Sequence, residues 1–67
     1  MSDTAGTILE LDRRIAATRE NIRQLVEQAA AVTGAASEEA TAERMAEQEA
    51  LLAELIKAKA GLTGGTP

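Results

Sequence analysis

The sequence predicts an all-α protein, an antiparallel αα-hairpin that dimerises into a four-helix bundle. Apolar residues recur at alternating steps of three and four in two stretches, which is the spacing of one helix face. A short connection containing a glycine and a serine separates the stretches, so the second helix is expected to return beside the first. The 67 residues include no Cys and no His, so neither a disulfide nor a zinc site is expected to stabilise so small a core. Association with another chain is the remaining route to adequate burial.

The first helix is expected over about residues 8–33. Residues 1–6 are small and polar and are expected to form a disordered arm, because Gly6 disfavours helix. Thr7 and Glu10 match a capping box, in which each side chain accepts a hydrogen bond from the other residue's amide. The predicted packing face consists of Ile8, Leu11, Ile15, Thr18, Ile22, Leu25, Ala29 and Val32. Val26 widens this face.

The turn is expected over residues 34–37. Gly34 suits the left-handed position that follows a helix end, and Ser37 suits the N-cap of the next helix. A lone glycine inside a helix costs only about 1 kcal/mol, so one continuous helix is the alternative. The hairpin is favoured because the glycine and the capping serine occur together at the right spacing.

The second helix is expected over about residues 38–60, which completes a hairpin over residues 7–62. Its face consists of Thr41, Met45, Gln48, Leu52, Leu55, Lys59 and Leu62, flanked by Leu51 and Ile56. This face is wider than one partner helix covers, which predicts an exposed apolar strip that closes into a four-helix bundle. Gly61 is expected to end the helix, with Leu62 packing back on its last turn and residues 63–67 forming a disordered tail.

Three polar residues interrupt the predicted core. Thr18 is expected to return its hydroxyl to a carbonyl one turn back, and Lys59 to extend into water. Gln48 has two interpretations: it is buried and hydrogen-bonded across a dimer, where it fixes the register, or it lies at the edge in water. The heptads are nearly symmetric in residue type, so syn and anti arrangements of the two hairpins both stay open.

The residue types that most chemistry requires are missing. Without His, Cys, Tyr or a glycine-rich phosphate loop, we expect no enzyme, no cofactor and no small-molecule substrate. The pairs Glu38/Glu39 and Glu43/Glu47 are expected on a solvated helix surface, and no metal site is expected. No apolar run approaches 18 residues and no leader is recognisable, so we expect a cytoplasmic protein, with a bacterial origin as the default, and no membrane partner.

A nucleic-acid face is a second functional hypothesis. The candidate residues are Arg13, Arg19 and Arg23, which a dimer would bring onto one mildly basic surface. Acidic residues interleave with these arginines, the net charge is −4, and no aromatic ring is present for a base to stack on. The composition therefore argues against nucleic acid as the partner.

In length and in its sequence of capped helix, short turn and capped helix, the chain resembles the Rop family of plasmid copy-number proteins over about residues 7–62. That resemblance implies two hairpins paired into an antiparallel four-helix bundle, and in that family the bundle binds RNA. The family's RNA-contacting face includes a Phe and lysines on the first helix, and this chain has neither there. The resemblance is thus architectural, and no functional residue is transferred.

We therefore expect a small, non-enzymatic protein–protein interaction or scaffolding module that acts as a homodimer. One alternative is an RNA- or DNA-binding adaptor that uses the arginines of the first helix. The other is a helical adaptor subunit that lends its apolar face to a helix of a larger protein.

Overall fold

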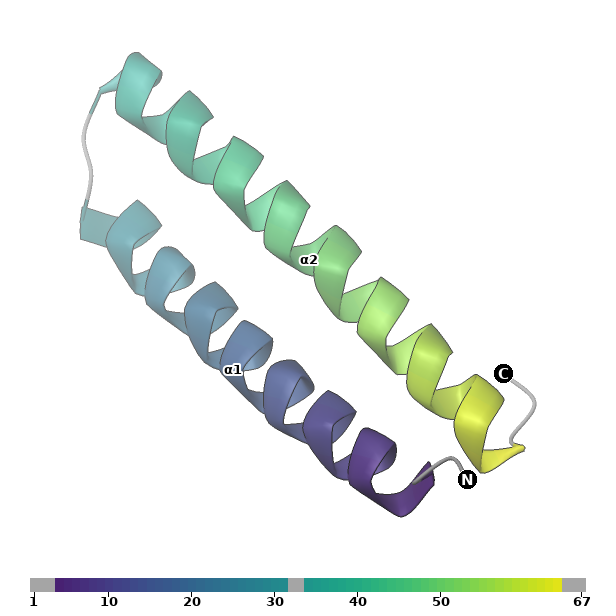
Figure 1. Ribbon diagram of the computed structural model, residues 1–67. Coiled ribbons are helices and arrows are strands. Elements are labelled where there is room, and N and C mark those ends of the chain that lie inside the picture. Colours follow the sequence, from purple (N-terminus) through teal and green to yellow (C-terminus); the bar gives the residue numbers. More distant parts are fainter. Residues whose placement is uncertain (1–3, 32–33, 65–67) are drawn as a thin grey trace.

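The computed structural model describes residues 4–31 and 34–64, and these residues form two helices. Helix α1 spans Thr4–Ala31 and helix α2 spans Ala35–Thr63. The two helices lie side by side and antiparallel, so the start of α1 and the end of α2 are at the same end of the molecule (Figure 1). The predicted all-α hairpin is confirmed at this level.

Helix α1 begins at Thr4, four residues before the predicted start at Ile8. Gly6 and Thr7 are therefore helical, so Thr7 is not the N-cap, and part of the expected arm belongs to the helix. One helical glycine costs about 1 kcal/mol, which does not stop a helix whose next turn is anchored by the half-buried Ile8.

The connection between the helices is shorter than predicted. Gly34 is the N-cap of α2, with φ 128° and ψ 132°, and its carbonyl accepts the Glu38 amide at 3.0 Å. Helix α2 thus begins before Ser37, and the predicted serine cap is replaced by a glycine whose backbone conformation other residues rarely adopt. Gly34 interrupts the helical path, which excludes one continuous helix. Val32 and Thr33 lie outside the described residues.

Helix α2 ends later than predicted. Gly61 is inside the helix, and the left-handed cap is Gly64, with φ 72° and ψ 8°. The Gly64 amide donates to the Ala60 carbonyl, which is the single-bond form of a left-handed helix end. The Thr63 hydroxyl also donates to that carbonyl, at 3.2 Å. The expected cap at Gly61, with Leu62 folding back, is therefore wrong, because a second glycine three residues on takes that position.

The heptad faces of the two helices meet in a contact that we call the seam. Its centre is formed by Ile15 and Leu55, which are buried together with Thr18 and Thr41. The other seam residues are half-buried: Ile8, Leu11, Ile22, Leu25, Met45, Gln48, Leu52 and Lys59. Ala29 and Leu62 continue the predicted stripes but are exposed.

The hairpin is long and thin. Its extents are 51 × 18 × 16 Å, and among the described residues no large side chain is completely enclosed. Two helices can cover only one face of each other, so the seam is bordered by water on both sides. Neither described helix has the apolar length that a membrane crossing requires.

Candidate interaction surface

The seam separates two flanks of the hairpin, one on each side of the contact between the helices. On each helix, a series of residues spaced alternately three and four positions apart runs along one side of the heptad face and forms one flank. A second series with the same spacing runs along the other side and forms the other flank. Each flank has an open hollow, and each hollow is lined by residues of both helices. The flanks differ in composition.

The first, which we call the polar flank, carries mainly carboxamides and charges. Its hollow has a volume of about 350 Å³ and is lined by Asn21, Gln24, Leu25, Gln28, Arg44, Glu47 and Gln48. Leu51, which is exposed, follows Arg44 and Glu47 at helical spacing on the same side of α2. This flank therefore offers hydrogen-bonding groups and one isolated apolar residue.

Gln48 lies at the edge of the seam. It is half-buried, and its Oε1 accepts a hydrogen bond from Asn21 Nδ2 at 3.3 Å. The side chain thus has a partner in its own chain and borders water. In the single hairpin Gln48 therefore lies at the edge, and the hydrogen bond across a dimer stays a prediction.

The second flank is rich in alanine, and we call it the alanine flank. On α1 it comprises Leu9, Asp12, Ala16, Arg19, Arg23 and Val26, and on α2 Ala42, Ala46, Glu49, Ala53, Ile56 and Ala60. Its hollow has a volume of about 310 Å³ and is lined by Asp12, Ile15, Ala16 and Arg19 of α1 and by Ile56 and Lys59 of α2. Small or aliphatic side chains therefore dominate this side of the hairpin.

One ion pair links the helices at this flank. Lys59 Nζ lies 2.7 Å from Asp12 Oδ1, and both side chains are partly exposed. Lys59, which was expected to extend into water, thus reaches a carboxylate of α1 as well. An exposed pair of this kind contributes at most about 1 kcal/mol.

Thr18 behaves as predicted. It is buried, and its hydroxyl donates to the Arg14 carbonyl at 2.7 Å, one turn back along α1. The polar group therefore needs no partner from α2, and the methyl group is left to pack in the seam.

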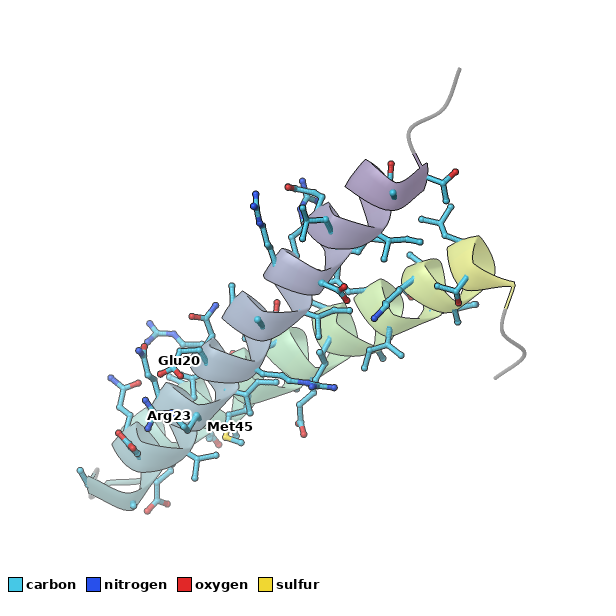
Figure 2. The ribbon with its side chains drawn as sticks, turned by 90° about the horizontal axis from the view of Figure 1, so that it is seen from below. Glu20, Arg23 and Met45 are labelled. Atoms are coloured by element: carbon cyan, nitrogen blue, oxygen red, sulfur yellow. The ribbon has the colours of Figure 1, made fainter. Side chains whose placement is uncertain are left out.

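Ion pairs within α1 occupy several of its charged groups. Arg23 forms ion pairs with both Glu20 and Glu27, and its Nη1 lies 2.6 Å from Glu27 Oε1. Figure 2 shows Glu20 and Arg23 directed toward one another. The hydrogen bond from Arg23 lowers the pKa of Glu20, and the same bond raises the pKa of Arg23. Arg14 similarly pairs with Glu10 at 3.2 Å, as the spacing of four residues predicts.

The three candidate nucleic-acid residues are exposed but do not share one face of α1. Arg13 and Arg19 are six positions apart, which separates them by about 120° around the helix axis. Arg23 is held between two glutamates, so its charge is largely balanced locally.

Within the described residues, no group of three or more acidic side chains is placed to share a metal ion.

Sequence reasoning identified part of the alanine flank and missed the rest. Val26 and Ile56 were recognised because they widen the packing faces. Leu9, Ala16 and the α2 alanines were missed, since alanine is typical both of cores and of surfaces. The available signal was a second series with steps of four and three, which runs through Ala42, Ala46, Glu49, Ala53, Ile56 and Ala60.

The described residues thus define a two-helix antiparallel hairpin with one polar and one alanine-rich flank. No protein-family model, curated protein or solved structure matches the chain. The comparisons give no support for the Rop family, and the structure shows the αα-hairpin alone.

Proposed function

We propose that this chain is a small, non-enzymatic protein–protein interaction or scaffolding module that acts as a homodimeric bundle of four helices. The supporting observation is the amount of surface that the single hairpin exposes. Its accessible surface is 4973 Å² for a mass of 7.0 kDa. A compact monomer of that mass exposes about 4,000 Å². The surplus of roughly 900 Å² is close to what each partner buries in an interface of standard size.

The nature of the exposed surface supports the same proposal. Five large hydrophobic side chains are exposed between 41% and 52%: Leu9, Val26, Leu51, Ile56 and Leu62. In a hairpin whose buried hydrophobic residues are only Ile15 and Leu55 among those described, much of the apolar content faces water. A second layer of helices is the arrangement that removes this surface from water.

The proposal includes no chemical step. General acid–base catalysis needs a group whose pKa lies near neutrality. The resolved shifts move Glu20 downward and Arg23 upward, away from neutrality in both cases. The charged groups at these positions therefore support an ion pair rather than proton transfer.

Sedimentation equilibrium combined with far-UV circular dichroism tests this proposal. Interference optics are needed, because the chain has no Trp or Tyr to absorb. We expect a strongly helical species with twice the 7.0 kDa chain mass at micromolar concentration. A helical monomer that persists as the protein concentration rises would contradict the homodimer.

The same sample separates the other hypotheses. A poorly helical monomer that becomes helical with one stoichiometric protein partner would replace the homodimer with an adaptor subunit. A shift of labelled RNA or DNA at about 50 mM salt that weakens as salt increases would instead support nucleic-acid binding.

A further inference from the structure

We infer that the alanine flank is covered by the alanine flank of a second copy of this chain. The inference rests on the proposed homodimer and adds which side of the hairpin is buried and what covers it. In a two-fold dimer the same patch serves both copies, so the patch must be complementary to itself. Composition, shape and charge of the alanine flank each meet this condition.

The exposed apolar residues are distributed unevenly between the flanks. Leu9, Val26 and Ile56 lie on the alanine flank and are 52%, 50% and 43% exposed. The polar flank carries only Leu51 of this kind, set among the glutamine and charged side chains of its hollow. Burial of the alanine flank therefore removes more apolar surface and leaves fewer polar groups without water.

The shape of the flank suits a close approach of helices. Ala46, Ala53 and Ala60 recur every seven residues on α2, so this side carries a small side chain on every second turn, with Glu49 and Ile56 between them. Beside them, the hollow of about 310 Å³ between Ala16 and Ile56 is open to the outside. Small residues next to an open hollow are what a facing helix needs to insert its aliphatic side chains.

The charge of the flank supports a second copy as the occupant. The flank holds two acidic residues, Asp12 and Glu49, and two basic residues, Arg19 and Arg23, in a chain of net charge −4. Lys59 borders its hollow and pairs with Asp12, and Arg23 pairs with Glu20 and Glu27 in its own helix, so the flank carries both signs and is not acidic. A patch of mixed sign meets its own copy with less repulsion than the acidic remainder of the surface would impose.

Two antiparallel hairpins can be placed flank to flank in two ways. In the first arrangement, α1 lies antiparallel to the second copy's α1, with Thr4 opposite Ala31. Asp12 is then opposite Arg23, and Leu9 is opposite Val26. If α1 instead lies beside the second copy's α2, at the height that the pair Asp12–Lys59 sets, Arg19 is level with Leu52, and Glu49 lies three residues from that level. The inference therefore concerns the flank and holds for both arrangements.

Two matched pairs of variants test it. Ala16 and Ala17 are adjacent and exposed on α1, but only Ala16 belongs to the alanine flank; Ala53 and Ala58 form the corresponding pair on α2. Each is replaced by Gln, a good helix former that adds bulk without charge. We expect Ala16→Gln and Ala53→Gln to raise the dimer dissociation constant about tenfold or more, and Ala17→Gln and Ala58→Gln to change it about twofold or less.

The outcomes are distinct. Equal effects within each pair, or larger effects of Ala17→Gln and Ala58→Gln, overturn the inference and leave the homodimer in place. A wild-type chain that stays monomeric overturns both. Circular dichroism of every variant verifies that the helix content is retained.

Cysteine cross-linking gives a second readout that does not depend on stability. The chain has no cysteine, so single substitutions report only their own position. If each helix faces the same helix of the second copy, we expect Ala53→Cys alone to form covalent dimers under oxidation. If α1 faces the second copy's α2, we expect covalent dimers from a mixture of Ala16→Cys and Ala53→Cys. Covalent dimers from Ala58→Cys, with neither of these two products formed, would place the interface on the polar flank and contradict the inference.

Discussion

Two of the four buried residues in the described hairpin are threonines, Thr18 and Thr41. For Thr18 the helix itself satisfies the hydroxyl, through the bond to the Arg14 carbonyl, so burial leaves no donor unpaired. The side chain then behaves in the seam as a methyl group of fixed orientation. A polar residue at a core position is compatible with a dry contact when its hydrogen bond is made within its own helix.

Replacing Thr18 by Val tests this interpretation. The Arg14 carbonyl also accepts a backbone amide within α1, so loss of the hydroxyl strands no group, and we expect stability within about 1 kcal/mol of wild type. Thr18→Ala removes the packing methyl as well and should destabilise by about 1–2 kcal/mol. Urea unfolding followed by circular dichroism measures both. An equal loss in the two variants would mean that the hydroxyl has a further role.

The pair Glu20–Arg23 predicts a specific titration. Because Arg23 lowers the pKa of Glu20 in the folded chain, any stability from this pair is present above the ordinary glutamate pKa and is lost as the pH falls through the folded value. In Arg23→Gln we expect the Glu20 pKa to rise toward its ordinary value. Side-chain carboxyl NMR measures it, with Arg19→Gln as the control. An unchanged Glu20 pKa in Arg23→Gln would contradict the assigned cause.

At the level of the helices, the sequence predicts what is packed better than where each helix ends. The seam residues were predictable because a periodic pattern over several turns involves many side chains at once. Helix ends depend on single residues, and this chain offers competing choices: Thr7 against Thr4, and Gly61 against Gly64. The difference in energy between such choices is about 1 kcal/mol or less, which local sequence does not resolve.

Two alanine substitutions distinguish the glycines. Gly61 is helical with no atom within 4 Å of an added Cβ, so Gly61→Ala should stabilise the hairpin by about 0.5–1 kcal/mol. Gly34 has φ 128°, where an alanine is strained even in open space, so Gly34→Ala should destabilise it by about 1–3 kcal/mol. Thermal unfolding of both variants measures the contrast. Destabilisation by Gly61→Ala would place the helix end there after all.

The pairing of residues from the two helices into flanks lay beyond the heptad pattern for a physical reason. Both flanks follow from the same heptads, and their difference appears only when the residues of α1 and α2 that share a side are known. Ala16 and Ile56 are distant in sequence and line one hollow, and neither residue alone indicates a surface. The antiparallel register of the seam is what combines them.

The whole molecule is extended for its length. Its radius of gyration is 15.1 Å, whereas a compact domain of this size has a value near 11 Å. A thin rod of two helices has a large surface for its volume, which is the general reason to expect a folded state linked to association.

Such linkage predicts a thermal midpoint that depends on protein concentration. If the dimer is the folded species, a higher concentration favours it by mass action and should raise the midpoint measurably for each tenfold step. Circular dichroism in cells of different path length measures this directly. A midpoint that is independent of concentration would show that the hairpin unfolds as a monomer.

The openness of the seam also determines how the protein responds to hydrostatic pressure. Pressure favours the state of smaller volume, and the volume change of unfolding scales with the voids that folding encloses. In the single hairpin both hollows are open to water, so pressure finds little trapped volume to eliminate. A second copy that covers the hollow beside Ala16 and fills only part of it would enclose such volume at the interface. Compression should then separate the two copies before it melts their helices.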